Sequence, residues 1–413
     1  MKIIKAYKIR CYPTREQEDL FARTEGSCRY VYNRVLREMS DAYRQGEKKP
    51  VIAMSRQVTQ WKRDEETVWL AEVPSDAIGQ ELRDLDRAFQ NFFAGRAKYP
   101  KKHKKHYGCA IRLSIDPRHT GKVRAWANQQ MILPGFGQMR LAQPERLPAA
   151  MPKLVTLRRD AAGRFFVAFG VEQEVQPLPA TGQAVGVDVN IKHLAVCSDG
   201  QKVEGAKALK RKLRHLRSQG RRLSRKVKGS RRWQRQKRRV GRIHARIADM
   251  RADRLHQLSH SLTARFDVIA LEDLFVKGML RNPKLARHLA DQSFGELRRL
   301  IEYKAAWRGR QVLLADRWAP TSKTCSCCGH KLEELSLSVR EWDCPACGAK
   351  HDRDTNAARN VLAFAAAGGN PVSDARGGWT TPTQPSESEA RKAPSEARTE
   401  CGHVADRMDR EAA

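Results

Sequence analysis

The chain has 413 residues, with 79 lysines and arginines against 46 aspartates and glutamates, a formal net charge of +33 and an isoelectric point near 10.2. This length allows two or three domains with separate cores, and so large a positive excess indicates a polyanionic partner, with nucleic acid favoured. No apolar run is long enough to span a membrane and the N-terminus lacks an apolar signal core, so we expect a soluble intracellular protein.

The first hundred residues predict a strand followed by helices. The segment KIIKAYKIRCYP alternates apolar and basic residues, as a strand does, and Thr14 with Gln17 forms a capping box that opens a helix. A three-and-four stripe then predicts a helix with a buried face, made of Ile78, Leu82, Leu85, Phe89 and Phe93. A basic loop closes this region, and we expect it to contact phosphates through Lys101, Lys102, Lys104 and Lys105.

Strand patterns return between Cys109 and Val171. Two alternating runs flank Asp160–Gly163, which predicts a β-hairpin. A strand, a helical segment and further strands suggest a β-rich barrel interrupted by a helical domain. Gln173–Gly182, with two prolines, is the expected linker to the next domain.

Two later strands end in carboxylates. AVGVDVNIKHLAVCSDG contains Asp188 near the end of its first apolar run, and RFDVIALED ends in Glu272 and Asp273. An aspartate at the first position is commonly a turn residue. Carboxylates at strand ends are also where α/β enzymes build metal sites. Alternation puts Glu272 and Asp273 on opposite faces without saying which face holds a site.

A strongly basic stretch separates these strands. Residues 207–246 contain nineteen lysines and arginines and no acidic residue. Apolar residues at helical spacing, interrupted at Gly229–Ser230, predict two long helices with a basic outer face. The apolar seam is Leu209, Leu213, Leu216, Leu223, Val227, Val240, Ile243, Ile247 and Met250. A merely solvated face is the alternative, but charge this dense favours an anionic partner, bound in part through Arg221, Arg225, Arg232 and Arg235.

The segment 321–360 carries the strongest motif. Two Cys-x-x-Cys pairs, Cys325/Cys328 and Cys344/Cys347, stand fifteen residues apart, the spacing of a four-cysteine zinc site. Four protein ligands leave no open position on the ion, so the predicted Zn²⁺ is structural. Ordinary buried cysteines are the alternative; Cys327 makes the first pair ambiguous, and His330 or His351 could substitute as a ligand. The remaining cysteines are scattered, which suits a reducing cytoplasm.

The motif HDRDTN follows the cysteines and leads into the helical run AARNVLAFAAA, which ends at Gly368–Gly369. Asp352 or Asp354 could simply cap this helix. Beyond Gly368 the composition is rich in Pro, Ser, Gly, Glu and Arg without apolar periodicity, and we expect disorder over residues 368–413.

Together these segments resemble the TnpB family, which comprises transposon-encoded, RNA-guided endonucleases similar to the type V CRISPR effectors. Its three catalytic segments are matched by GVDVNIKHLAV, by IALEDL and by the cysteine-rich segment with HDRDTNAARN. Its opening region is matched by YPTREQEDLF, CRYVYNRVL and FFAGRAKYPKKHKK. The resemblance covers roughly residues 1–365.

The resemblance implies a multidomain α/β fold with an RNase H-like (RuvC) nuclease domain. This domain would comprise residues 181–321 and 350–367, with a zinc ribbon inserted at 322–349. A wedge-like β-barrel would comprise residues 1–12 and 106–175, interrupted by a helical recognition domain at 13–105. The implied partners are a guide RNA and target DNA, without a membrane, in a prokaryotic cytoplasm at the nucleoid.

By motif match, Asp188, Glu272 and Asp354 are the implied catalytic carboxylates, holding two Mg²⁺ ions for phosphodiester hydrolysis. The choice of Glu272 over Asp273, and of Asp354 over Asp352, rests on the resemblance. The family often has glycine where this chain has Asn190, a residue that tolerates the same turn conformation. An alternative is a catalytically silent, RNA-guided DNA-binding regulator or transposition accessory protein. A strand-joining transposase would need a tyrosine nucleophile with a histidine pair, or another acidic triad, and neither is evident.

Overall fold

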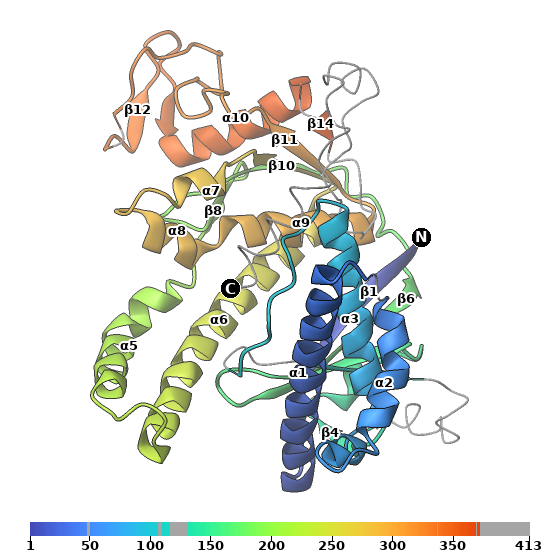
Figure 1. The fold of residues 1–413 in the computed structure, drawn as a ribbon. Helices are drawn as coiled ribbons and strands as arrows, with labels where there is room; N and C mark the ends of the chain where they lie inside the picture. Colours follow the sequence, from blue (N-terminus) through green and yellow to red (C-terminus); the bar gives the residue numbers. More distant parts are fainter. Residues whose placement is uncertain (48–49, 106–109, 116–130, 337, 369, 372–413) are drawn as a thin grey trace. The chain divides into compact units, whose positions relative to one another are not determined.

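The computed structural model describes residues 1–47, 50–105, 110–115, 131–336, 338–368 and 370–371 (Figure 1). The chain forms two compact units. The described residues of one are Met1–Ile3 and those from Glu174 to Pro371, and the described residues of the other lie within Ile4–Gln173. No helix in the described ranges has both the length and the apolar character needed to cross a bilayer.

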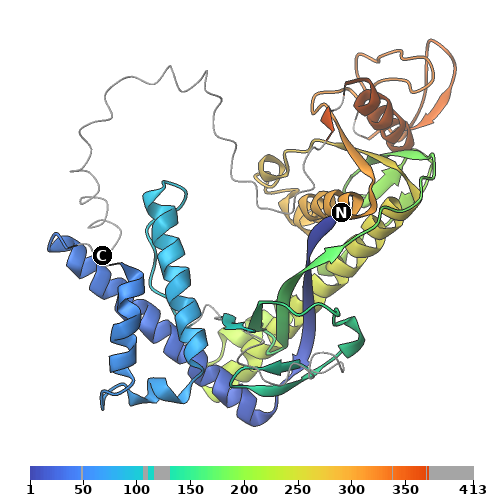
Figure 2. The same cartoon turned by 90° about the vertical axis from the view of Figure 1, so that its right-hand side faces the viewer.

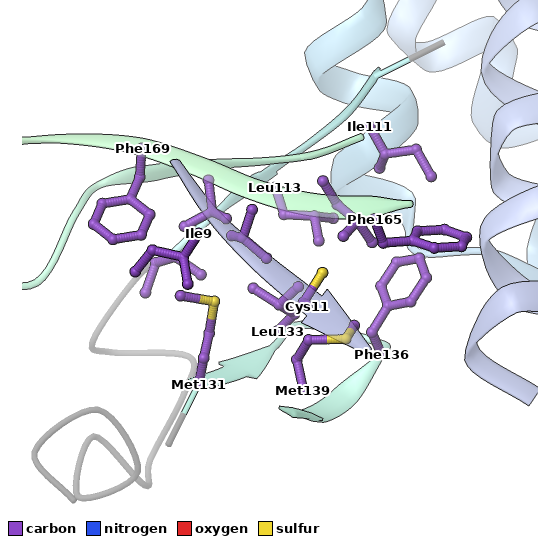
Figure 3. Close-up of a cluster of buried hydrophobic side chains, with 14 of the residues drawn as sticks. Ile9, Cys11, Ile111, Leu113, Met131, Leu133, Phe136, Met139, Phe165 and Phe169 are labelled. Carbon is purple, nitrogen blue, oxygen red and sulfur yellow. The ribbon is translucent and has the colours of Figure 1, made fainter. Parts of the chain in front are cut away.

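The N-terminal unit is built on a six-stranded sheet in the order β2-β5-β6-β1-β4-β3. Its strands are β1 (Lys2–Tyr12), β2 (Ala110–Ser114), β3 (Met131–Leu133), β4 (Gly137–Leu141), β5 (Leu154–Arg159) and β6 (Phe165–Glu174). Every strand sends alternate side chains into one hydrophobic cluster, including Ile9, Leu113, Leu133, Met139 and Phe169 (Figure 3). The sheet is nearly closed around this cluster, and β2 and β3 are its edges over the described residues.

Helices occupy the chain between β1 and β2, as the sequence predicts. They are α1 (Arg15–Arg44), α2 (Met54–Trp61) and α3 (Ser75–Phe93), drawn blue to cyan in Figure 2. The predicted capping box is present, because the backbone N–H of Gln17 donates to Thr14 Oγ1 at 3.3 Å and that of Thr14 donates to Gln17 Oε1 at 3.0 Å.

The apolar stripe of α3 is shorter than expected. Ile78, Leu82, Leu85 and Phe89 are buried, but Phe93 is 63% exposed, so its prediction as a core residue is wrong. Phe93 is the last residue of α3, so the stripe reaches the end of the helix there and the burial stops at Phe89.

The C-terminal unit contains a second six-stranded sheet, in the order β14-β11-β10-β7-β8-β9. Its strands are β7 (Ala184–Asp188), β8 (Ala195–Cys197), β9 (Lys202–Val203), β10 (Val268–Glu272), β11 (Gln311–Ala315) and β14 (Asn370–Pro371). β7, β10 and β11 are parallel, so their carboxyl ends lie at one edge of the sheet. The segment 368–413 is predicted to be disordered, but its residues Asn370–Pro371 form β14, which pairs with β11. Residues 372–413 lie outside the described ranges.

Helices cover both faces of this sheet (Figure 1). On one face, side chains such as Val187 and Leu271 pack against α6 (Arg231–Arg265) and α9 (Phe294–Arg308). Ala270 and Ala315 pack against α10 (Arg353–Gly368) on the opposite face. The remaining helices of the unit are α5 (Ala208–Ser224), α7 (Val276–Met279) and α8 (Ala286–Gln292).

Gly186 permits the close approach of α10 to β7. A Cβ atom built on Gly186 would lie 2.0 Å from the carbonyl oxygen of Ala358 and 2.8 Å from the backbone nitrogen of Leu362. Only glycine avoids this overlap, since both neighbouring atoms belong to the helix backbone. The glycine therefore sets the distance at which α10 crosses the strand that ends in Asp188.

Candidate active site

Three carboxylates from distant parts of the chain converge at the carboxyl edge of the second sheet. The pairing of Val187 with Leu271 in the parallel register places Asp188 and Glu272 side by side at the ends of β7 and β10. Their side chains lie on the face that α10 covers, because Gly186 and Ala270, two residues earlier on each strand, face that helix. Asp354, in the first turn of α10, is 9% exposed, and Asp188 is 8% exposed.

The electrostatics show that these carboxylates influence one another. Burial, the charge of Glu272 and the charge of Asp354 raise the pKa of Asp188 to about 7, although a hydrogen bond from Asn190 opposes the shift. Burial also raises the pKa of Glu272, against the lowering effect of a hydrogen bond from Thr321. A cluster of acids that resists ionisation in the absence of cations has the electrostatics of a cation site.

Each carboxylate also lies close to a polar side chain outside the cluster. Asn190 Nδ2 donates to Asp188 Oδ2 at 3.1 Å, and Thr321 Oγ1 donates to Glu272 Oε1 at 3.1 Å. Arg340 lies 3.6 Å from Asp354 Oδ1. Asn190 does not adopt the left-handed conformation that a glycine at this position could take, because its φ is negative. Its side chain acts instead as a hydrogen-bond donor.

The neighbouring acids are engaged elsewhere. Asp273 forms ion pairs with Arg298 at 2.8 Å and with Arg317, and although burial acts to raise its pKa, hydrogen bonds from both arginines lower it. The geometry thus favours Glu272 over Asp273 as a free cation ligand.

Asp352 is the capping residue of α10. Its Oδ1 accepts hydrogen bonds from Thr355 N and Thr355 Oγ1, both at 2.9 Å, and its Oδ2 lies 2.6 Å from Lys202 Nζ. Asp352, and not Asp354, therefore caps the N-terminus of this helix. Asp354 is left facing Asp188.

The residues fit divalent cations with hard oxygen ligands, since three carboxylates at one edge, two of them buried, offer up to six oxygens. Over the described residues, however, only cysteine-containing groups bring three or more ligand atoms all within 4.8 Å of one another. The carboxylates are therefore more widely spread than the ligands of one compact ion. Two cations about 3.5–4 Å apart suit such a spread.

The four predicted zinc ligands form a compact group. The Sγ atoms of Cys325, Cys328, Cys344 and Cys347 lie within 4.8 Å of one another, with Cys325–Cys347 at 3.7 Å and Cys328–Cys344 at 3.6 Å. Tetrahedral coordination with Zn–S bonds of about 2.3 Å needs sulfur atoms about 3.8 Å apart, so the site fits Zn²⁺.

The alternative zinc ligands have different positions. His351 and Cys327 form a second group with Cys325, in which His351 Nε2 lies 3.0 Å from Cys325 Sγ. His330 belongs to neither group. His351 is therefore placed to donate to a ligand sulfur, while the evenly spaced four cysteines remain the complete set.

Three side chains that the sequence analysis did not single out connect the cysteines to α10. Asn356 and Asn360, buried on α10, donate to backbone carbonyls of Thr321 and Thr324, at 2.6–2.8 Å. Thr321 then reaches Glu272. The sequence signal for these contacts is the pair of asparagines one helical turn apart in NAARN. Asparagine is unfavourable inside a helix, so two of them on one face indicate that their side chains have hydrogen-bond partners elsewhere.

The basic stretch forms the predicted pair of helices, α5 and α6, joined by a turn at Gly229. Gln236 Nε2 on α6 donates to Gln219 Oε1 on α5 at 2.8 Å, and both glutamines are buried. Val227 is 78% exposed because it lies in the turn, so its assignment to the apolar seam is wrong. Arg221, Arg225, Arg232 and Arg235 are exposed.

The lysines of the basic loop in the N-terminal unit are also accessible to solvent. Lys101, Lys102, Lys104 and Lys105 are exposed. The loop is fixed through His103, whose backbone N–H donates to Asn33 Oδ1 at 2.7 Å and whose ring stacks on Tyr32. Fixed backbone with free ammonium groups suits phosphate contact.

Reversing the charge of Arg221, Arg225, Arg232 and Arg235 to glutamate is expected to weaken nucleic-acid binding to a similar degree for every target sequence. Removing one phosphate contact should lower the slope of log affinity against log salt by about 0.7–0.9. Salt titrations of complex formation measure the slope for wild type and for the variant. Equal slopes would show that these arginines face only solvent.

Comparison with known proteins places these features in a family. The chain is a multidomain α/β protein, and its C-terminal unit contains both a carboxylate cluster and a four-cysteine group. Residues 168–283 match the family described as "Probable transposase", residues 294–361 match the "Cas12f1-like, TNB domain" and residues 1–48 match a "Helix-turn-helix domain".

Two curated relatives align over most of their length. A protein of Streptomyces pristinaespiralis named "Putative RNA-guided DNA endonuclease" is 42% identical over 368 residues, covering 88% of this chain and 89% of the relative. "Putative RNA-guided DNA endonuclease InsQ" of Escherichia coli K12 is 33% identical, covering 88% and 92%. The chain therefore belongs to the TnpB family, and the resemblance seen in the sequence is confirmed.

A solved structure also aligns along the chain. "Cryo-EM structure of the Cas12f1-sgRNA-target DNA complex" covers 87% of this chain and 99% of its own, at 14% identity and a TM-score of 0.35.

Proposed function

We propose that this protein is an RNA-guided DNA endonuclease encoded by a mobile element, hydrolysing phosphodiester bonds at Asp188, Glu272 and Asp354. The convergence of these three carboxylates at one sheet edge carries the proposal, together with relatives named for that activity. The presence of all three argues against a catalytically silent regulator.

The three carboxylates would hold two Mg²⁺ ions, which supply a nucleophile and stabilise the departing 3′ oxygen. The protein's contribution is the geometry: β7 and β10 fix two ligands in parallel register, and α10 brings the third across Gly186. Arg340, half exposed beside Asp354, adds a positive charge where a phosphate would approach.

The domain assignment follows from the same proposal. Residues 181–321 and 350–367 form the RuvC-like nuclease domain, and residues 322–349 form a ribbon with a structural Zn²⁺. Residues 1–12 and 106–175 form the wedge, and residues 13–105 the recognition domain. A basic surface on each unit would bind the guide RNA and its duplex with DNA through phosphates, while base pairing selects the target.

Sequencing the RNA that copurifies with the protein tests the proposal most directly. One RNA species with a variable guide portion is expected, and replacing that portion should redirect cleavage to the matching DNA. The Asp188→Ala complex, as a matched control, should bind the redirected target without cutting it. Cleavage at unchanged positions after the guide is replaced would contradict RNA guidance.

A further inference from the structure

Thr321 links the carboxylate cluster to the cysteine-rich segment. Its hydroxyl donates to Glu272 Oε1 at 3.1 Å, and the residue is only 8% exposed. An ionised carboxylate only accepts hydrogen bonds, and it has about four lone-pair positions. Thr321 therefore occupies one position and fixes the side chain's orientation while the others stay free for a cation.

The backbone of Thr321 is held in turn by α10. Asn360 Nδ2 donates to the carbonyl oxygens of Thr321 at 2.8 Å and Thr324 at 2.6 Å. Asn360 is 4% exposed, so each broken bond would leave a buried polar group unsatisfied. This cost ties residue 321 to the helix that carries Asp354.

Asn356 holds the next part of the same segment, one helical turn earlier. Its Nδ2 donates to the Thr324 carbonyl at 2.7 Å, and its Oδ1 accepts from Ser326 N at 2.9 Å. Cys325, a predicted zinc ligand, lies between these two contacts. The two asparagines thus hold residues 321–326, which we call the ribbon root, against α10 on both sides of the cysteine.

We propose that Thr321 is a positioning residue for Glu272, and that Asn356 and Asn360 keep it in place by clamping the ribbon root to α10. The proposal rests on the proposed function, since it takes Glu272 as a cation ligand. It makes the four-cysteine group and the carboxylate cluster two ends of one hydrogen-bonded structure. Groups that orient metal ligands commonly change metal affinity about 10–100-fold when they are removed.

Thr321→Val tests this because valine keeps the shape of the side chain and loses the hydroxyl. Thr321→Ser is the matched control, since it keeps the donor. The probe is Mn²⁺, which prefers the same oxygen ligands as Mg²⁺ and whose free ion gives an electron paramagnetic resonance signal. Titrating the full-length, zinc-loaded chain without nucleic acid avoids binding to RNA phosphates.

Thr321→Val is expected to raise the Mn²⁺ concentration at half-saturation about 10–100-fold, and the serine variant to restore wild-type binding. In the RNA complex, cleavage by the valine variant should recover at higher Mg²⁺, with kcat approaching that of wild type. Zinc content and unfolding temperature should match wild type in both variants, which separates positioning from a general loss of structure.

Wild-type Mn²⁺ binding by Thr321→Val would overturn the inference, as would equal impairment of the valine and serine variants. Asp188→Ala separates this failure from failure of the proposed function. If Asp188→Ala loses Mn²⁺ binding and Thr321→Val does not, the proposed role of Thr321 is wrong and the proposed metal centre stands. If Asp188→Ala also binds normally, the proposed metal centre itself is wrong.

Discussion

Replacing Asp188, Glu272 or Asp354 by alanine is expected to reduce DNA cleavage by several orders of magnitude and leave binding of guide and target nearly intact. The physical reason is that cations act in such a site only while their ligands hold them in a fixed geometry. Binding is proposed to depend instead on exposed cations such as those of α5 and α6, which these substitutions do not touch. Cleavage rates and binding affinities, measured on the same RNA complexes, check both parts.

Asp352→Asn is the matched control for Asp354→Ala. Asparagine can keep the cap on α10, and the residue lies only two positions away. It should retain most of the activity. Full activity of Asp354→Ala, or cleavage that persists in EDTA, would contradict the assignment of the site.

The same carboxylates make cation binding depend on pH. The pKa of Asp188 is raised from 3.8 to about 7 in the folded chain. Between these values the folded state holds a proton that the unfolded state has released, so the cation-free protein loses stability as pH rises through this window. A bound cation replaces that proton, and Mg²⁺ should raise the unfolding temperature more above pH 7 than below it. Asp188→Ala should remove this difference.

Loss of zinc is expected to have the second large effect. Cys328→Ser or Cys344→Ser should release the ion and unfold the ribbon, because structural zinc contributes on the order of 10 kcal/mol to local folding at neutral pH. Cleavage should fall as well, since Ser326 and Thr321 of the ribbon root contact Asn356 and Glu272. Elemental analysis and activity of the same preparations measure the two effects together.

Cys327→Ser supplies the control for this experiment. Cys327 lies in the first cysteine pair and is exposed, but it is not one of the four evenly spaced ligands. The variant should keep one zinc per chain and its activity. Much less than one zinc per chain in active, folded wild-type protein would refute the structural role of the metal.

Local patterns in the sequence account for most of the elements. The alternation in residues 2–12 predicts β1, the capping box at Thr14 predicts the start of α1, and the interruption at Gly229 predicts the turn between α5 and α6. These signals depend on residues near one another in the chain. They fail at the ends of elements: Phe93, the last residue of α3, and Val227, in the turn between α5 and α6, keep the helical spacing but are exposed.

The relation among the site residues could not be predicted from local patterns. Alternation leaves Glu272 and Asp273 equivalent, and only the packing of α10 on one face of the sheet distinguishes them. The sequence does not predict why residue 186 is a glycine, because the reason is the close approach of the Ala358 backbone, which is far away in the chain. Thr321 likewise has no local signature, and the asparagine repeat that includes Asn360 does not reveal its partners, because they are far away in sequence.

Because α10 comes late in the chain, its residues are among the last of the second unit to be synthesised. Asp188 is synthesised long before Asp354, and at ~5–20 residues per second a ribosome needs on the order of ten seconds to travel between them. After α6 has been synthesised, and until α10 follows, the nascent chain presents basic helices without a complete set of carboxylates. We therefore expect a chain whose translation stops before α10 to hold nucleic acid without cutting it. Decayed gene copies truncated there would act as competitors of the intact nuclease.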